Sequence, residues 1–296
     1  MSRSTLIEPK ERTFRSDGLS LHYAEWGDPN QETVILVHGN RDQSRSWDFF
    51  VRELSHRGFS QAHMVALDLR GHGDSGWAAP ERGYQHCDFV LDLTAFLRHL
   101  GKETVILIGH SLGGGVCILF TGSFPKKVRK LLLIEATGPM ARSDQDVPEL
   151  LAKWLAGEES RGESFFYKTL QEAARAIQRR FPLIPENASA HMARYGTKQT
   201  DRGYVWKYDP RVRFPSYSSF TESQIQTFIE RIQIPTMLIF GSDGGFIKSP
   251  RYQRVRLFKT GKVVEIPGAG HHVPHEKPRE LAEAVAPFLG SFPDQD

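Results

Sequence analysis

The stretch Val105-Ile-Leu-Ile-Gly-His-Ser-Leu-Gly-Gly-Gly115 contains a serine between a predicted strand and a predicted helix. The run Val105–Ile108 is short, apolar and β-branched, which is typical of a buried strand, and the residues after Ser111 have helical spacing. Gly109 and Gly113 flank the serine in the pattern G-x-S-x-G, and glycine leaves room for a crowded turn. Such a turn holds its serine in a strained backbone conformation with the hydroxyl clear of the sheet. The stretch therefore predicts that Ser111 is a nucleophile; the alternative is an ordinary serine at the start of a helix.

Two backbone N–H groups are predicted to bind the negative charge that develops on an attacked carbonyl. The helix N-terminus that follows Ser111 directs the N–H of Leu112 toward that charge. His38-Gly39 ends another expected strand, so the N–H of Asn40 should point to the same mouth of the sheet. The Asn40 side chain is either an additional donor or a turn residue, since asparagine favours turns.

Strands and helices alternate along the chain on either side of this stretch. Buried apolar runs predict six strands, at 33–37, 64–67, 104–108, 131–134, 236–240 and 263–266. Residues 12–26 predict an antiparallel hairpin with Asp17-Gly18 as its turn. Helical spacing predicts helices at 47–56, 86–100, 112–123 and 278–289. This order predicts an α/β fold with a mostly parallel, eight-stranded sheet flanked by helices.

One interval interrupts the alternation after the sixth strand. Between residues 139 and 233 we find no buried-strand pattern, and 148–155, 164–180 and 222–231 have helical spacing instead. An insertion at the loop end of a sheet is expected to cover a site. We therefore predict a core of residues 12–138 and 234–290 and a helical cap of residues 139–233.

Three further segments carry a resemblance to a known family. They are Val37-His-Gly-Asn40, the loop Asp68-Leu-Arg-Gly-His-Gly-Asp-Ser75 and Gly268-Ala-Gly-His-His-Val-Pro-His-Glu276. With the serine turn, they make the chain similar to capped serine hydrolases of the α/β-hydrolase superfamily, from about Phe14 to the last helix. The run Asp201–Arg213 resembles the serine-hydrolase-like proteins of this superfamily. The resemblance implies the α/β-hydrolase fold, and it implies that Asp68–Ser75, here called the brace loop, is structural.

The catalytic base is predicted to be His271. An imidazole can take the serine proton and pass it to a leaving group near neutral pH. His271 follows a predicted strand at the position where the resemblance places the catalytic histidine. His272 is the rival, and we expect His272 and His275 to be polar surface residues.

The acid that orients the base has two candidates. In most relatives the acid lies three residues after the glycine that ends the next-to-last strand. In this chain that glycine is Gly241, and the position three residues later is occupied by Gly244. Asp243 lies one residue earlier. Glu135 ends the strand beside the one that carries Ser111, and a branch of the haloalkane dehalogenases resembles this arrangement, with glycine in the usual position. We prefer Glu135 to Asp243, and either acid keeps the chain order serine, acid, histidine.

The resemblance implies a serine hydrolase that acts on a small or medium apolar ester, thioester, lactone or related acyl substrate. Its catalysis would pass through an acyl-enzyme. Dehalogenases and epoxide hydrolases use an aspartate nucleophile, and Arg41 stands where epoxide hydrolases tend to have proline. Two alternatives stay open: a ligand-sensing or binding protein with little turnover, and a carbon–carbon bond hydrolase.

Composition limits the partners. The chain has 296 residues, 25% charged residues and a formal net charge of +3, so we expect no nucleic-acid and no membrane partner. Cys87 and Cys117 form neither a disulfide framework nor a metal motif, and we predict no metal and no cofactor. We expect a cytoplasmic monomer or homodimer that binds a small-molecule acyl substrate. Between Glu149 and Arg213 there are 12 Lys and Arg against 8 Asp and Glu, a surplus that only weakly favours a carboxylate-bearing substrate.

Overall fold

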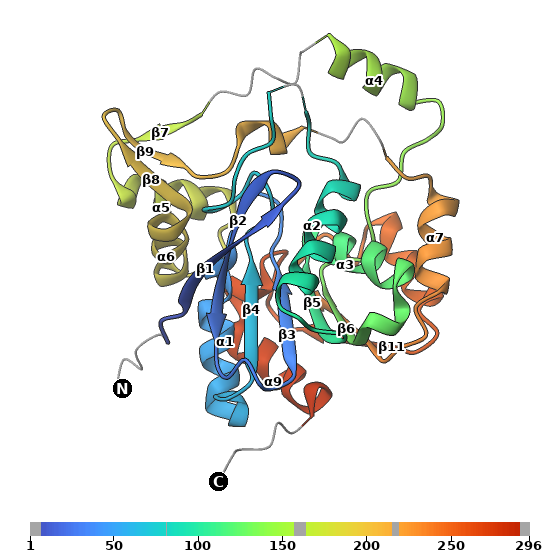
Figure 1. Cartoon of the computed structure of the whole chain (residues 1–296). Helices are drawn as coiled ribbons and strands as arrows, with labels where there is room; N and C mark the ends of the chain where they lie inside the picture. Colours follow the sequence, from blue (N-terminus) through green and yellow to red (C-terminus); the bar gives the residue numbers. More distant parts are fainter. Residues whose placement is uncertain (1–6, 81, 157–163, 215–218, 291–296) are drawn as a thin grey trace.

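The computed structural model describes residues 7–80, 82–156, 164–214 and 219–290. Its centre is an eight-stranded sheet in the order β1-β2-β4-β3-β5-β6-β10-β11 (Figure 1). The strands are β1 (Lys10–Ser16), β2 (Leu19–Trp26), β3 (Thr33–Val37), β4 (His63–Leu67), β5 (Val105–His110), β6 (Val128–Ile134), β10 (Thr236–Gly241) and β11 (Gly261–Ile266). The pairs β1–β2 and β2–β4 are antiparallel and the other neighbouring strands pair in parallel, so the predicted mostly parallel sheet is confirmed.

The first two strands form the predicted hairpin. Asp17 and Gly18 connect them, and both have positive φ, 46° and 79°. Two successive residues with positive φ match the right-handed twist of the flanking strands, which explains why Asp-Gly occupies this turn. The hairpin adds to the sheet through pairing of β2 with β4.

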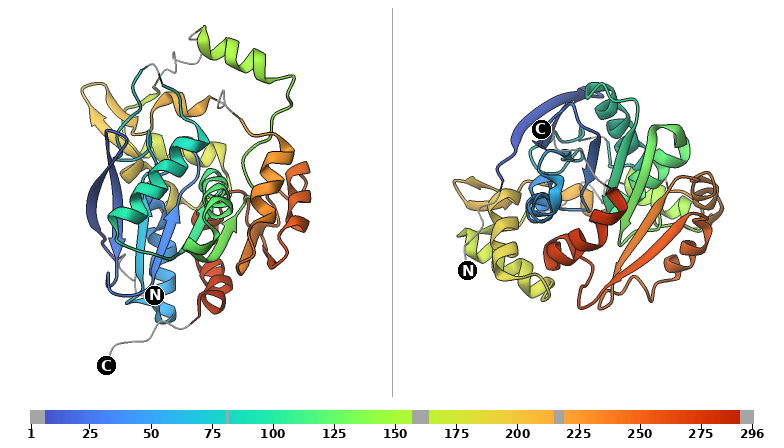
Figure 2. Two further views of the ribbon diagram at one scale, coloured as in Figure 1. Left: turned by 45° about the vertical axis from the view of Figure 1, so that its right-hand side comes forward. Right: turned by 90° about the horizontal axis from the view of Figure 1, so that it is seen from below.

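Helices cover both faces of the sheet (Figure 2). One face packs against α1 (Asp48–Leu54) and α9 (Pro278–Leu289), and the other against α2 (His86–His99), α3 (Leu112–Ser123) and α7 (Glu222–Glu230). Short helical segments in the described part of the chain include η1 (Ser44–Trp47), η2 (Ser55–Phe59), η3 (Pro125–Lys127), η5 (Pro210–Arg213), η6 (Pro250–Leu257) and α8 (Val273–Glu276).

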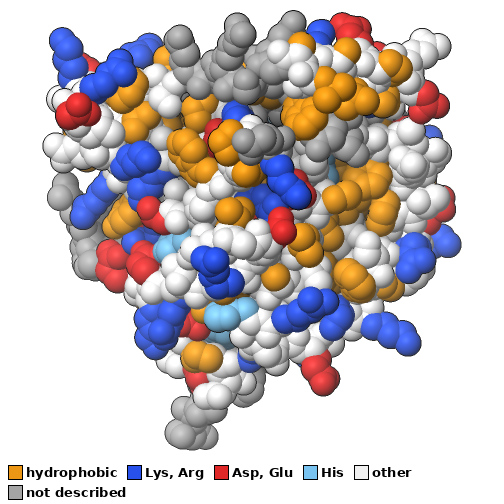
Figure 3. Space-filling model, turned by 45° about the horizontal axis from the view of Figure 1, so that its top comes forward, with side chains coloured by type: hydrophobic (Ala, Val, Ile, Leu, Met, Phe, Trp, Pro, Cys, Tyr) orange, Lys and Arg blue, Asp and Glu red, His pale blue; other side chains and the backbone are white. Residues whose placement is uncertain are grey.

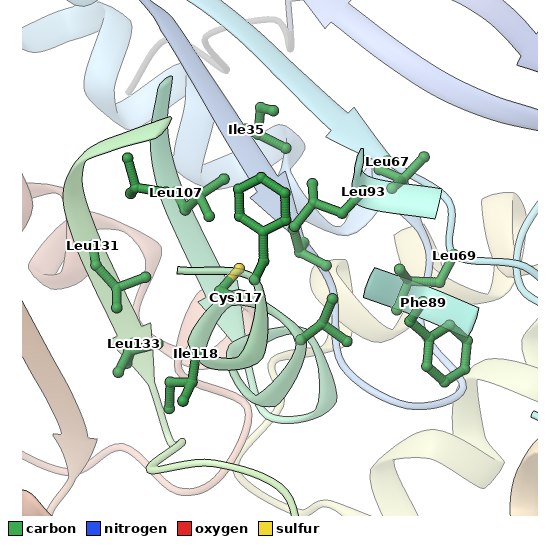
Figure 4. Close-up of a cluster of buried hydrophobic side chains, with 14 of the residues drawn as sticks. Ile35, Leu67, Leu69, Phe89, Leu93, Leu107, Cys117, Ile118, Leu131 and Leu133 are labelled. Atoms are coloured by element: carbon green, nitrogen blue, oxygen red, sulfur yellow. The ribbon is translucent and has the colours of Figure 1, made fainter. Parts of the chain in front are cut away.

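Side chains of the central strands alternate between the two faces. In β5, Leu107 belongs to the core beneath α3, whereas Ile106 and Ile108 belong to the core beneath α1 and α9. Figure 4 shows Leu107, Ile35 and other strand residues around Cys117 of α3. Because both faces are buried, these strands appear in the sequence as continuous apolar runs, which is why their positions were predictable.

The prediction of a helical insertion between β6 and β10 requires a correction, because the insertion is not entirely helical. Besides α4 (Val147–Leu155), α5 (Leu170–Arg180) and α6 (Glu186–Gly196), it contains a three-stranded antiparallel sheet in the order β7-β9-β8. Its strands are β7 (Phe166–Tyr167), β8 (Thr197–Thr200) and β9 (Gly203–Trp206). These strands have two to four residues, few of which are buried, so they leave no buried apolar run in the sequence and the pattern did not reveal them.

The parts of the insertion differ in how they pack. Helices α5 and α6 form a small core of their own with Phe49 of α1. By contrast, α7 packs on α3, with Ile225 and Ile229 in the main core, although it falls inside the range predicted as cap. Helix α4 has no buried residue and lies apart from the sheet (Figures 1 and 2). The division into core and cap remains a proposal, with α7 on the core side by its packing.

Hydrophobic side chains gather on the face that carries the insertion, interspersed with arginines and lysines (Figure 3). Met140, Leu155 and Phe165 are among the exposed ones. Within the described ranges, no helix combines the length and the apolar character that crossing a bilayer requires.

Candidate active site

The strained turn predicted at Ser111 is present. Ser111 has φ 50° and ψ −112°, and it occupies the position just before the first residue of α3. Its N–H donates to the carbonyl of Ile134 (2.9 Å), and the N–H of Gly113 donates to the carbonyl of His38 (3.1 Å). A Cβ at Gly109 would lie 2.7 Å from the carbonyl oxygen of Gly113. The neighbouring strands therefore hold the serine in a conformation that few non-glycine residues adopt.

His271 lies between this serine and a buried carboxylate. Its Nε2 is 3.0 Å from Ser111 Oγ, and its Nδ1 is 3.1 Å from Glu135 Oε2. The His271 side chain is 41% exposed, whereas the Glu135 side chain is fully buried. If Nδ1–H donates to the carboxylate, Nε2 is left as the acceptor that faces the hydroxyl. The structure thus brings together three residues that the sequence separates widely.

The carboxylate of Glu135 is itself held in place. Glu135 has φ 53°, and its N–H donates to the carbonyl of Ile239 (2.9 Å). Its second oxygen, Oε1, accepts a hydrogen bond from the N–H of Gly241 (2.8 Å). A Cβ at Gly244 would lie 3.3 Å from this Oε1. The glycine at the family's usual acid position therefore leaves space for Glu135.

Asp243 does not join this arrangement. It is exposed, and its carboxylate accepts a hydrogen bond from Ser242 Oγ (2.7 Å). Its N–H donates to the carbonyl of Ala269 (2.8 Å), which fixes the backbone of the loop. Of the two candidate acids, the geometry brings Glu135 and not Asp243 to His271, and the catalytic role of Glu135 remains a prediction.

The two predicted oxyanion donors lie at the same site. Leu112 is the first residue of α3, and among the described residues no backbone acceptor pairs with its N–H or with that of Asn40. The Asn40 side chain is engaged elsewhere: Nδ2 donates to the carbonyl of Val212 (3.1 Å), and Oδ1 lies 3.2 Å from Nε2 of His72. The side chain therefore tethers the insertion to the core, and the backbone N–H is the group left for an oxyanion.

The brace loop is structural, as expected. Asp68 accepts hydrogen bonds from His22 Nδ1 (2.8 Å) and from the N–H of Asp74 (2.9 Å). Arg70 binds Asp92 through two hydrogen bonds of 2.6 and 2.7 Å. Burial would lower the pKa of His22, but hydrogen bonds to Asp68 and Glu11 outweigh burial and raise it to about 10.

In the described part of the chain, His22, Asp68 and Asp74 form the one group with the proximity of metal ligands. A metal needs a neutral imidazole, and the raised pKa keeps His22 protonated at neutral pH. Asp68 is already occupied by His22 and by backbone N–H groups. These residues fit a brace and not a metal site.

A cluster of histidines behind the site corrects two expectations. His275 is buried rather than on the surface, with Nε2 2.9 Å from Asp42 Oδ2. Both ring nitrogens of His272 are buried and have no hydrogen-bond partner in the described structure. The ring packs against the Phe181 ring in a T-shaped arrangement, with 4.2 Å between the ring centres. His271, His272 and His275 are close in sequence, but only the fold places Asp42 beside them.

His110 is a further residue that the pattern G-x-S-x-G did not single out. It is buried, and its Nε2–H donates to the carbonyl of His271 (2.8 Å). Burial lowers its pKa to about 3, with the nearby His271 adding to the effect. A neutral His110 thus anchors the backbone of the residue that faces Ser111.

Ser111 lies where two cavities meet. The larger, of about 810 Å³, extends under the insertion, and the smaller, of about 470 Å³, is lined by residues of α2 and α3. Ser111, Asn40 and His271 line both. Aromatic side chains from the insertion line the larger one: Phe165, Tyr167, Phe181, Trp206 and Tyr208.

The sequence profile described as the alpha/beta hydrolase family matches residues 34–284. The chain belongs to the alpha/beta hydrolase family. The match spans all strands from β4 to β11 and includes Ser111, Glu135 and His271. This assignment makes the protein a hydrolase and agrees with the fold described above.

Individual proteins resemble this alpha/beta hydrolase along most of their length. The bifunctional esterase/perhydrolase DCH of Acinetobacter calcoaceticus is 26% identical over 287 residues, which cover 93% of this chain and 98% of that protein. A Drosophila melanogaster protein named "Probable serine hydrolase" is 26% identical over 280 residues, 89% of this chain and 82% of its own. The crystal structure of a hypothetical protein from Pseudomonas aeruginosa superposes with a TM-score of 0.84 at 26% identity, covering 96% of this chain and 98% of that one.

Proposed function

We propose that this hydrolase is a serine hydrolase in which Ser111 is the nucleophile, His271 the base and Glu135 the acid. The observation that carries the proposal is the continuous chain of contacts Ser111–His271–Glu135, with distances of 3.0 and 3.1 Å. Nucleophile, base and orienting group within hydrogen-bond reach are the geometric signature of an activated serine.

The chemistry follows from these positions. Nε2 of His271 takes the proton of Ser111 Oγ as the oxygen attacks an acyl carbonyl, and Glu135 stabilises the resulting imidazolium. The N–H groups of Asn40 and Leu112 hold the oxyanion. The imidazolium then protonates the leaving group, and the same histidine activates a water that hydrolyses the acyl-enzyme.

The substrate class is a small or medium ester, thioester, lactone or related acyl compound. The aromatic lining of the larger cavity suits apolar substrate parts, and its volume of about 810 Å³ lies within the range of small-molecule sites. The relatives named esterase and serine hydrolase agree with this class at 26% identity. A small-molecule partner, a monomer or homodimer and a cytoplasmic location stay predictions.

A fluorophosphonate probe tests the proposal, because it reacts covalently with an activated serine. We expect rapid labelling of the wild type and none of Ser111→Ala. Ser123→Ala, which changes an exposed serine of the same helix, is the matched control and should label normally. A series of p-nitrophenyl esters of graded chain length, with lactones beside them, then identifies the preferred acyl group. Absence of labelling in the wild type would instead favour the ligand-binding alternative.

A further inference from the structure

The larger cavity contains guanidinium groups that the triad does not use. Its lining includes Tyr208 and four arginines: Arg41, Arg179, Arg180 and Arg213. Among the described residues, no carboxylate forms an ion pair with Arg41 or Arg180. Asp42 also lines the cavity, but its carboxylate is bound to His275 and Ser46. Arg41 and Arg180 therefore bring positive charge to this cavity without an ion-paired carboxylate among the described residues.

Arg41 is the arginine of this group that is adjacent in sequence to a proposed oxyanion donor. It follows the oxyanion residue Asn40 directly and has φ 64°, so its backbone is held in the left-handed region. It is partly buried. Burial lowers its pKa, and the charges of Arg180 and Arg213 lower it further. Arginine nevertheless stays protonated, so its charge faces the cavity at a cost in free energy that an anion would relieve.

We propose that the larger cavity binds an anionic group of the substrate, with Arg41 and Arg180 as its partners. The substrate is then an acyl compound that carries a carboxylate away from the bond to be cleaved. This inference rests on the proposed serine-hydrolase function, which it makes more specific. Two guanidinium groups from different segments, the oxyanion loop and α5, can each offer paired N–H donors to a carboxylate. The aromatic walls accommodate the chain between the carboxylate and the acyl carbon.

The lining of the smaller cavity also contains arginines, namely Arg142, Arg213 and Arg251, but it does not include Arg41. Arg251 lines it, but this guanidinium lies over the ring of Phe246 at 4.7 Å and interacts electrostatically with Glu135. Its charge is therefore partly balanced by the triad itself. Arg41 has no such acid among the groups that affect its pKa.

The anionic group can belong to the acyl part or to the leaving group, because Ser111 borders both cavities. Two pairs of substrates distinguish these sources. Mono-4-nitrophenyl adipate and 4-nitrophenyl hexanoate differ only in whether a carboxylate or a methyl group ends the acyl chain. The hexanoate esters of 4-hydroxyphenylacetate and of 4-ethylphenol differ in the same way on the leaving group.

The measurement is the ratio of kcat/KM for the anionic ester to that for its neutral match, in the wild type and in Arg41→Gln and Arg180→Gln. We expect a ratio of about 10 or more in one pair, reduced about tenfold in Arg41→Gln and also lowered in Arg180→Gln. Arg41→Lys should keep part of the preference. Arg175→Gln, which removes an exposed arginine of α5 outside the cavity lining, should keep all of it.

A binding experiment separates failure of this inference from failure of the proposed function. Calorimetry on Ser111→Ala measures binding of monomethyl adipate and of methyl hexanoate, with and without Arg41→Gln. Tighter binding of the adipate, lost in the double variant, supports the anion site even if no ester is turned over. Neutral and anionic esters that bind and react equally, with labelling of Ser111 intact, overturn the anion site and leave the proposed function standing.

Discussion

The central sheet and the insertion differ in how deeply their residues are buried. Strands β3, β5 and β6 are almost completely buried and lie between two layers of helices, so each residue has a fixed place. The insertion between α4 and η5 has a small core, short strands with few buried residues and one helix without a buried residue. The sheet therefore holds the residues of the proposed triad in place, whereas the insertion contributes walls of the larger cavity.

Polar contacts join the two regions at several points, among them the ion pair of Lys207 with Asp74 and the hydrogen bond from Tyr84 to Asp209. His191 of α6 has Nε2 3.0 Å from the carbonyl of Arg45, and the Arg45 guanidinium lies 4.0 Å from the ring centre of Tyr195. Asn40 reaches Val212 from the core side. Substitutions in the sheet should therefore act on kcat, and substitutions in the insertion should act on KM and selectivity.

The largest expected effect concerns the acid on the sheet. Glu135→Gln removes the charge that stabilises the imidazolium, and by analogy with other triads kcat should fall by about 10⁴-fold. Asp243→Asn is the matched control, because its carboxylate is exposed and bonded to Ser242. Steady-state kinetics on a p-nitrophenyl ester measures both. Near-wild-type turnover of Glu135→Gln would contradict the assignment.

The core is also expected to lose stability in acid. The pKa of buried His110 is lowered from 6.5 to about 3, so between these values the unfolded state binds a proton that the folded state does not. The free energy of unfolding therefore falls as pH decreases below 6.5, by up to about 1.4 kcal/mol per pH unit for this group. Its contribution is complete above pH 6.5, where neither state is protonated.

Urea denaturation at several pH values between about 7 and 5 measures this loss, and His110→Asn provides the comparison. The variant should show a shallower dependence on pH, whatever its stability at neutral pH. Equal slopes in the two proteins would show that His110 is not protonated on unfolding in this range.

Local sequence patterns predict some of these structural features, whereas others depend on contacts between distant segments. Buried strands and the turn at Ser111 were predictable because local apolar runs and glycine spacing dictate them. From the sequence, the acid that contacts His271 could be narrowed only to two candidates. The contact that Glu135 makes depends on the space that Gly244 leaves in another loop. The pairing of His275 with Asp42 was missed, because neither residue's local pattern indicates a distant buried partner.

In the insertion, truncating a side chain that lines the larger cavity should weaken substrate binding. Phe181 lines the larger cavity and packs on His272 at 4.2 Å. Phe181→Ala should raise KM for an apolar ester by about tenfold, corresponding to lost apolar burial of about 1.4 kcal/mol, with a smaller effect on kcat. Phe165→Ala, at an exposed lining position, is the milder comparison. A fall in kcat that exceeds the rise in KM would show that the insertion also positions the reacting groups.

The smallest effect tests how tightly the sheet holds the acid. A Cβ at Gly244 would lie 3.3 Å from Glu135 Oε1 and 3.2 Å from the carbonyl oxygen of Gly241, so one of these must yield by a few tenths of an ångström. Gly241 is held in β10, and the carboxylate is the group that can move. Because catalysis is sensitive to small misplacements, Gly244→Ala should lower kcat by about 3- to 10-fold while KM stays nearly constant. Gly245→Ala, where a Cβ meets open space, should leave kcat unchanged. If Gly244→Ala is equally silent, Glu135 has more freedom than its buried hydrogen bonds indicate, and the contrast between a rigid sheet and an adaptable insertion is weaker than the geometry implies.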